Sequence, residues 1–412
     1  MKRAIIGVLC LVGPAAAAQQ SVSRLSLEAC VDIALDNNLS CRAADVAVRQ
    51  SQLLEATCFD VPQTTLALVQ TATDGGGPDN GLKVSQELDF PTVYAARKKY
   101  LKSETEQERR KAEMTKNDIV REVCSLYCSL IYSREVCAVV AAQDTLYARF
   151  CRVAKAHYDA GETSRMEWLN ARRLWNENSL TLERARLECA SLQLRLQALM
   201  NVDYTVEPVE DKLRPMAGFA PDGDVDFSST PEGMVADGRL MVARRNQYLA
   251  KQGFAPALSV GLTSQLLIDG FNPYHIDRRR FDKGNFIGFE VGVSVPLFFG
   301  SQRAKVRAAG QAVEAEELQK AADRSRQAAA YRTLNEECAA ALRAVDYYQT
   351  IGMPEAEEMV RLSLVSYELG DIGYEEHARN LEATLAVKRA NAEAIETYNQ
   401  TLIKLKHIKG ER

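Results

Sequence analysis

The sequence contains two pairs of similar segments separated by one constant distance along the chain. VSQELDFPTVYAARKK at 84–99 resembles VSVPLFFGSQRAKVR at 293–307, and YDAGETSRME at 158–167 resembles YELGDIGYEE at 367–376. The offset is 209 residues in both cases, since 293 minus 84 equals 367 minus 158. An offset conserved over this distance indicates an internal duplication, so the chain is expected to fold as two copies of one long unit.

The spacing within each copy predicts very long helices. Pro91 and Gly161 are 70 residues apart, as are Gly300 and Gly370, and a single proline, Pro354, lies inside these two stretches. At 1.5 Å per residue, such a helix would extend for roughly 100 Å, far more than an ordinary globular domain requires. We therefore expect one long helix in each copy, which ends at the corresponding glycine.

The N-terminus has the plan of an export signal. MKRAIIGVLCLVGPAAAA combines a basic start, an apolar run and an Ala-x-Ala cleavage site, which predicts a signal peptide over 1–18 and Gln19 as the mature N-terminus. Leu9 before Cys10 fits a lipoprotein cleavage site poorly, so no lipid anchor is expected. Beyond 1–18, no uninterrupted apolar run reaches the ~18 residues of a membrane helix, so any membrane crossing is expected to use strands.

Composition argues against several classes of function. Without Lys2 and Arg3 the chain keeps 49 of its 51 basic residues against 55 acidic ones, with no basic block, which disfavours nucleic acid as a partner. Nine of the ten cysteines remain after cleavage, none in a Cys-x-x-Cys pair, and the four histidines are scattered. We interpret the cysteines as packing residues rather than metal ligands. With no nucleophile elbow, phosphate loop or ligand cluster, neither catalysis nor a cofactor is predicted.

Each copy is expected to begin with a helix, over 27–57 and 231–252, and to continue with two strands. In the second copy Leu258, Val260 and Leu262 alternate with small or polar residues, and residues 286–295 alternate in the same way. An apolar face opposite a small or polar face is typical of a membrane barrel around water. A half-buried soluble sheet would give the same alternation.

After the strands the chain is strongly helical, with further helices expected over 164–200 and 374–408. Narrow apolar seams at steps of three and four residues predict packed, coiled helices. The seam residues are Ile119, Val123, Leu126, Leu130, Ile395, Tyr398, Leu402 and Leu405. We divide the mature chain into a first repeat at 19–201, a linker at 202–230 and a second repeat at 231–412.

The order of these elements and motifs resembles the TolC-like outer-membrane efflux proteins over about 25–408. The motifs are Ser-Gln-x-x-x-Phe after the first strand pair and Pro-Leu-Phe-x-Gly-x-x-Arg after the second. The matching residues are Ser85, Gln86, Phe90, Pro91, Tyr158, Gly161, Ser164, Leu169, Ala171, Pro296, Leu297, Phe298, Gly300, Arg303, Tyr367, Gly370 and Asn399. No single one of these residues is specific for the family, but the whole set in this order and spacing is.

The resemblance implies a mainly α fold with a small β part. Three chains with four strands each would form a 12-stranded outer-membrane β-barrel, continued by an α-helical tunnel through the periplasm of a Gram-negative bacterium. Several chains are also required on physical grounds, because four strands cannot close a barrel and open sheet edges are not tolerated in lipid. The expected partners are two further copies, outer-membrane lipid, a periplasmic adaptor protein and an inner-membrane pump of the resistance-nodulation-division type.

FPTVY at 90–94 and PLFFGSQ at 296–302 are most similar to the branch that works with heavy-metal and cation exporters. The function implied is a passive channel in a tripartite efflux system, with metal cations among the candidate substrates. Drug efflux and type I protein secretion remain alternatives within the channel class. A non-conducting periplasmic coiled-coil adaptor is the alternative outside it; it accounts for the helices and the signal peptide but not for two strand pairs.

The candidate site lies at the two helix-to-helix turns. The residues expected at this tip, where the resemblance places adaptor docking, are Tyr158, Gly161, Ser164, Tyr367, Gly370 and Gly373. The carboxylates expected to narrow the pore are Asp371, Glu375, Glu376 and Glu167. Acidic residues at a helix start also interact favourably with the helix dipole, so capping is the alternative role. His377, beside Glu376, receives no role from the sequence.

Overall fold

The structure is a computed structural model that describes residues 22–72, 78–220, 225–265, 287–369 and 371–411. The signal peptide expected at 1–18 lies outside these residues. The chain divides into two compact units, which we describe one at a time. Unit 1 comprises the chain up to Asn38, Glu122–Ala217 and Ala341–Gln400, and unit 2 comprises Leu39–Arg121, Gly218–Ala340 and Thr401–Arg412.

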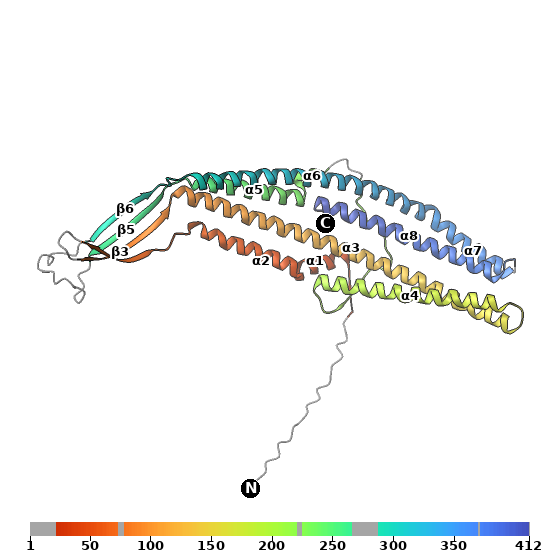
Figure 1. Ribbon diagram of the computed structural model, residues 1–412. Coiled ribbons are helices and arrows are strands. Elements are labelled where there is room, and N and C mark those ends of the chain that lie inside the picture. Colours follow the sequence, from red (N-terminus) through yellow and green to blue (C-terminus); the bar gives the residue numbers. More distant parts are fainter. Residues whose placement is uncertain (1–21, 73–77, 221–224, 266–286, 370, 412) are drawn as a thin grey trace, which may run out of the picture. The chain divides into compact units, whose positions relative to one another are not determined.

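Helices dominate both units, and strands form two small sheets (Figure 1). In chain order the elements are β1 (Val22–Leu25), α1 (Leu27–Asn37), α2 (Leu39–Leu54), the 3-10 helix η1 (Glu55–Phe59), β2 (Thr65–Ala72), β3 (Pro78–Asp89), α3 (Pro91–Asp159), α4 (Arg165–Met200), β4 (Thr205–Pro208), the 3-10 helix η2 (Phe227–Ser229), α5 (Pro231–Gln252), β5 (Ala257–Gln265), β6 (Ile287–Ser294), α6 (Gly300–Tyr347), the π-helix η4 (Tyr348–Gly352), α7 (Met353–Leu369) and α8 (Tyr374–Lys409).

Unit 2 contains an antiparallel sheet of four strands in the order β2-β3-β5-β6. The prediction of two strands per copy is confirmed. The two copies join at the centre of the sheet, where β3 pairs with β5 from Gly81 opposite Gln265 to Asp89 opposite Ala257. Within the described residues, β2 and β6 are the two edges of this sheet.

The two faces of the sheet differ sharply in chemistry. The strand registers place one row of apolar side chains on a single face, and several of them are exposed: Leu66, Leu68, Val260, Leu262, Ile287, Phe289, Val291 and Val293. Small and polar residues occupy the other face, where Lys83 Nζ lies 2.6 Å from Glu290 Oε2. The predicted alternation is therefore present, and both faces of the sheet are accessible in the single chain.

The first strand pair leads directly into α3 through a cluster of specific contacts. Asp89 N–H donates to the Tyr94 hydroxyl at 3.0 Å, and Arg97 pairs with the Asp89 carboxylate at 2.9 Å. The Tyr94 ring stacks on Phe59 with centroids 4.9 Å apart. Pro91 begins the helix, a position where its missing N–H leaves no helical hydrogen bond unmade.

The long helix of the first copy is confirmed, because α3 runs without interruption for 69 residues. The expectation of an equally continuous helix in the second copy was wrong. The stretch from Gly300 to Leu369 is broken into α6, η4 and α7, and the π-helical turn ends two residues before Pro354. Proline lacks an N–H, and its ring clashes with the carbonyl four residues earlier, so local widening of the helix accommodates it.

The single helix expected over 27–57 was also wrong. It divides into α1 and α2 at Asn38, whose φ of −60° and ψ of 128° are extended. The Asn38 side chain donates to the Leu199 carbonyl at 2.8 Å, and its backbone N–H donates to the Ala34 carbonyl at 2.8 Å. The backbone bond to Ala34 is the last helical bond of α1, and the side chain provides a donor to a carbonyl in the last turn of α4. The helices expected over 164–200, 231–252 and 374–408 are confirmed as α4, α5 and α8.

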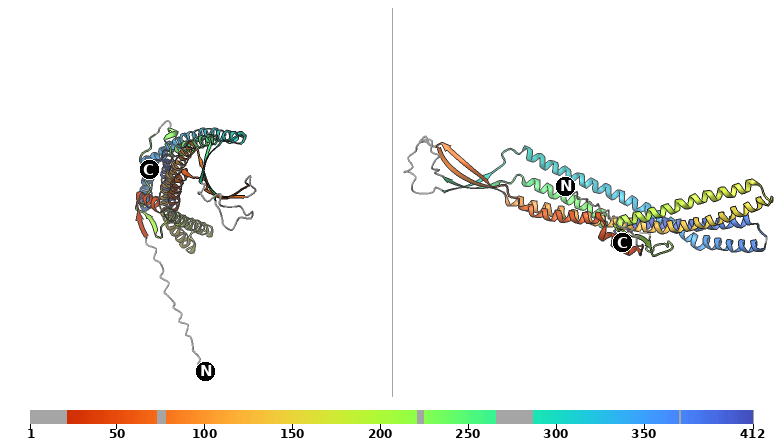
Figure 2. Two further views of the ribbon diagram at one scale, coloured as in Figure 1. Left: turned by 90° about the vertical axis from the view of Figure 1, so that its left-hand side faces the viewer. Right: turned by 90° about the horizontal axis from the view of Figure 1, so that it is seen from below.

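Unit 1 is built from two helical hairpins, α3–α4 and α7–α8 (Figure 2). The Asp144 carboxylate joins α3 to α4 by accepting from Ser179 at 2.8 Å. The Tyr147 hydroxyl joins α3 to α8 by donating to Glu382 at 2.7 Å. The Thr384 hydroxyl joins α8 to α7 by donating to the Ala356 carbonyl at 3.1 Å. The lateral order within unit 1 is therefore α4, α3, α8, α7, as Figure 1 shows.

The predicted apolar seams are buried. Leu130 and Val123 of α3 are fully enclosed, and the remaining seam residues are at most 7 % exposed. One finding was not anticipated from the sequence: by length and composition alone, one window of α3 is long and apolar enough to cross a membrane, and 44 % of it is buried. The fully buried members of this helix form the core of unit 1, which explains its apolar composition.

The linker is fastened to α8 by Asn399, which is fully buried. Its side-chain oxygen accepts from Met216 N–H at 2.9 Å, and its amide nitrogen donates to the Arg214 carbonyl at 2.9 Å. The neighbouring Tyr398 hydroxyl donates to the Met216 carbonyl at 3.1 Å. Asn399 thus provides hydrogen-bond partners for backbone groups of the Arg214–Met216 segment, which has no regular structure of its own.

None of the described cysteines is in a disulfide, and several are buried. Burial raises the pKa of Cys30 and of Cys128 to about 12 in each case, which keeps both thiols protonated. Protonated, buried thiols pack as small apolar groups, in agreement with the role expected from the sequence.

Candidate functional site

The end of the α3–α4 hairpin is a tight, fully bonded reversal. Gly161 has a φ of 75°, in the left-handed region that glycine adopts without strain, which confirms the expectation at this position. Its N–H donates to the Tyr158 carbonyl at 3.0 Å, and Glu162 N–H donates to the His157 carbonyl at 2.9 Å. Ser164 caps α4 by accepting from Glu167 N–H at 3.3 Å. The turn is therefore fixed by its own backbone and cap.

The end of the α7–α8 hairpin has a related construction. Gly370 lies outside the described residues, so the positive φ expected there stays a prediction. Asp371 N–H donates to the Ser366 carbonyl at 2.8 Å, and α8 begins immediately after Gly373. Gly373 does not have a positive φ, and the space around its α-carbon is open.

The structure places the candidate carboxylates at these ends in different surroundings. Glu375 and Glu376 occupy the first turn of α8, and Asp371 precedes them by one turn; all three are exposed. Glu375 also pairs with Arg379 at 3.3 Å. Glu167 instead takes part in the cap of α4, since its backbone N–H donates to the Ser164 hydroxyl and its carboxylate accepts from the Thr163 hydroxyl. The second hairpin end is therefore the more acidic of the two.

A stacked pair of rings supports each hairpin end, and the two pairs are related by the internal duplication. Tyr158 stacks on Trp168 at 5.5 Å in the first copy, and Tyr367 stacks on His377 at 5.0 Å in the second. Both tyrosines and their partners are 209 positions apart, since 377 minus 168 equals 367 minus 158. This gives His377 a structural role that the sequence analysis did not assign, and it identifies Trp168, which was missed although the offset pointed to it.

The surroundings of the two pairs differ in polarity. His377 is buried, its Nδ1 lies 2.9 Å from the Ser363 hydroxyl, and Asn380 donates to that hydroxyl at 3.1 Å. The positions that correspond to Ser363 and Asn380 in the first copy are the buried Ala154 and Ala171. The second copy therefore has a hydrogen-bonded cluster where the first copy has apolar packing.

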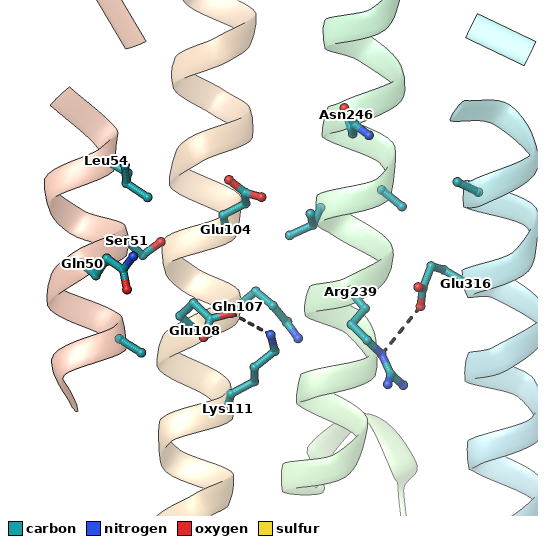
Figure 3. A pocket seen from close by; sticks show the side chains of 14 residues that line it. Gln50, Ser51, Leu54, Glu104, Gln107, Glu108, Lys111, Arg239, Asn246 and Glu316 are labelled. Carbon is teal, nitrogen blue, oxygen red and sulfur yellow. Dashed lines mark hydrogen bonds and ion pairs between the residues drawn. The ribbon is translucent and has the colours of Figure 1, made fainter. Parts of the chain in front are cut away.

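Unit 2 contains a cavity of about 460 Å³ between α2, α3, α5 and α6 (Figure 3). Gln107 is buried there, and a Cβ on Gly238 would lie 1.7 Å from its Oε1, so a larger residue at 238 would displace the Gln107 amide. The rim charges neutralise one another: Lys111 pairs with Glu108 at 2.7 Å, and Arg239 lies 3.6 Å from Glu316. The arrangement is that of a polar groove between packed helices.

Nowhere among the described residues do three His, Cys, Asp or Glu side chains come together to hold a metal ion.

Comparison with known proteins finds similar structures but no similar sequence. No family model matches the chain, and no curated protein matches it significantly. The fold is similar to that of the outer-membrane channel OprN, with a TM-score of 0.75 and 14 % identity over 94 % of this chain and 90 % of that one.

Two further solved structures agree with this likeness. The outer membrane protein VceC of Vibrio cholerae matches with a TM-score of 0.72 and 14 % identity over 93 % of this chain and 96 % of VceC. The outer membrane channel MtrE of Neisseria gonorrhoeae, in its open state, matches with a TM-score of 0.68 and 16 % identity over 93 % and 89 % of the two chains. The expected helix-rich, TolC-like fold is confirmed.

Proposed function

We propose that this chain, which has the fold of the TolC-like outer-membrane efflux channels, is the passive outer-membrane channel of a tripartite efflux system. The observation that carries the proposal is the four-stranded sheet of unit 2. One of its faces is an exposed apolar surface and the other is small and polar, with the Lys83–Glu290 ion pair. A sheet with these two faces suits a wall between lipid and water.

The sheet also explains why the proposed channel is an oligomer. In lipid, the unpaired N–H and C=O groups along an exposed strand edge have no water to bond, so β2 and β6 each need a partner strand. Pairing β2 of one copy with β6 of the next satisfies both edges at once. Three copies give the 12-stranded barrel that the resemblance implies, in the outer membrane of a Gram-negative bacterium, with the helices extending into the periplasm.

We assign the two hairpin ends to the periplasmic tip of this channel, where an adaptor protein docks and an inner-membrane pump of the resistance-nodulation-division type delivers the substrate. The tight reversal at Gly161 and the bond from Asp371 N–H to the Ser366 carbonyl at the second hairpin end suit such contact. Threefold symmetry would repeat Asp371, Glu375 and Glu376 around the tunnel, and a ring of carboxylates concentrates cations. Metal cations are therefore the substrate class that we favour.

Two neighbouring residues of β5 provide a matched test. Val260 lies on the apolar face, and Ser259 lies on the polar face. A lysine on the lipid face of a barrel costs about 2–4 kcal/mol at the bilayer midplane, whereas a lumen position tolerates charge. Val260→Lys should therefore reduce the heat-modifiable, SDS-resistant trimer in outer-membrane fractions, and Ser259→Lys should leave its amount close to that of the unmodified chain.

The result that would overturn the proposal is equally specific. A chain that fractionates with soluble periplasmic proteins, forms no SDS-resistant species and is insensitive to both substitutions would be a periplasmic coiled-coil adaptor instead. Equal loss of the trimer in both variants would show that the two faces of the sheet do not meet different solvents.

A further inference from the structure

An ion pair crosses the polar face of the sheet in unit 2. Lys83 Nζ of β3 lies 2.6 Å from Glu290 Oε2 of β6, although β5 separates these two strands in the sheet. In the register of the sheet, Lys83 is opposite Thr263 of β5, and Glu290 is opposite Gly261. The pair therefore bridges the strand between them and joins the first copy of the duplicated unit to the second.

Glycine at position 261 leaves room for this bridge. A Cβ on Gly261 would lie 3.5 Å from Glu290 Cβ and 3.7 Å from Glu290 Oε2, so a longer side chain there would compete for the space of the carboxylate. The Lys83 and Glu290 side chains are 34 and 57 % exposed. The neighbouring residues on this face are small: Ser85, Ser259, Gly288 and Gly292. Both charges are therefore accessible from the polar side of the sheet.

A third charged side chain, Glu87, lies on the same face. It is four residues from Lys83 along β3, and residues an even number apart on a strand point to the same side. Glu87 is exposed and is opposite Ser259 of β5. Within the part of the chain that the structure describes, its carboxylate is in no ion pair. One positive and two negative charges leave one net negative charge per chain on this part of the face.

We infer that Lys83, Glu87 and Glu290 set the charge selectivity of the barrel. Lys83 neutralises Glu290 across β5, and Glu87 remains as the charge that favours cations. The inference rests on the proposed function, in which the polar face lines a water-filled lumen and three copies repeat these charges around it. At 0.1 M salt the Debye length is about 10 Å, so fixed charges on the wall act on ions that pass close to them.

The reversal potential of purified trimers in a planar bilayer, under a KCl gradient, measures this selectivity. Lys83→Gln leaves Glu290 uncompensated and should raise the cation-to-anion permeability ratio by about twofold or more. Glu290→Gln leaves Lys83 to offset Glu87, so it should lower the ratio as much as Glu87→Gln does. The double variant with Lys83→Gln and Glu290→Gln keeps the net charge and should match the unmodified chain. Exposed ion pairs contribute little to stability, so all four variants should still form trimers.

Ser259 offers a matched control, because it is directly opposite Glu87. Ser259→Lys should lower the permeability ratio as Glu87→Gln does. Ser259→Gln adds a long side chain without a charge and should leave the ratio unchanged. Every shift should shrink at about 1 M salt, where the Debye length is about 3 Å.

The possible failures point to different errors. Trimers that conduct with one and the same reversal potential in every variant would overturn the inference and leave the proposed channel standing. A double variant that stays at the value of Lys83→Gln would overturn the neutralisation of Glu290 by Lys83. Absence of any current from the unmodified chain would instead refute the proposed function, and the inference with it.

Discussion

Replacement of Asn399 by alanine tests how the linker is held to unit 1. The substitution removes the acceptor of Met216 N–H and the donor to the Arg214 carbonyl, both at 2.9 Å. A hydrogen bond contributes about 1 kcal/mol net, so the two together amount to about 2 kcal/mol. Most of this loss should appear as local opening of the linker, because the seam residues of α3 and α8 keep their own contacts.

Amide hydrogen exchange at Met216 measures this opening directly. The loss of one bond of about 1 kcal/mol should accelerate exchange about fivefold. Leu213 N–H is the internal reference, because it donates to Glu135 at 3.2 Å and does not depend on Asn399. Asn399→Asp keeps the acceptor of Met216 N–H but buries a carboxylate oxygen against the Arg214 carbonyl, so it should open the linker at least as much as alanine does. Unchanged exchange at Met216 in the alanine variant would refute the reasoning.

Three further predictions concern other parts of the chain. Gly161→Ala should lower stability by about 1 kcal/mol through backbone strain alone, because φ is 75° and no atom lies within 4 Å of the added carbon. Thermal dissociation of the trimer measures this loss of stability, and no change would mean that the turn relaxes. Burial raises the pKa of Glu396, although hydrogen bonds from Ser129 and Gln400 oppose the increase, so the contribution of this carboxyl group to stability is full at low pH and is lost as pH rises through the raised pKa. Glu396→Gln should therefore stabilise the protein more at pH 8 than at pH 4 in thermal melts. An equal effect at the two pH values would contradict the raised pKa. Neutralising the acidic residues of the second hairpin end should weaken cation selectivity and block by trivalent cations from the periplasmic side, whereas unchanged block would show that these carboxylates only cap α8. They are Asp371, Glu375 and Glu376.

The sequence predicted those features that depend on local chemistry and periodicity. The constant offset located α3, which begins at Pro91 and ends before the turn at Gly161, because proline and glycine restrict where a helix begins and ends. The steps of three and four residues from Val123 to Leu130 and from Tyr398 to Leu405 identified side chains that are buried, because a helix presents such residues on one face. The strands were found because their alternation has a period of two.

The features that the sequence did not predict depend on contacts between distant segments. At the break after α1, the Asn38 side chain donates to the Leu199 carbonyl, 161 residues away. The pairing of β3 with β5 joins the two copies, and no local pattern specifies it. At the candidate site, the pairing of Trp168 with Tyr158 could have been found by applying the offset of 209 to every aromatic residue.

The most direct test of the proposed channel is conductance of the purified protein in a planar lipid bilayer. The account predicts discrete, long-lived current steps from a trimer, because three sheets closed through β2 and β6 enclose a continuous water-filled lumen. The current should be linear in the number of inserted trimers. A monodisperse, soluble monomer that inserts into no bilayer and gives no current would contradict the account.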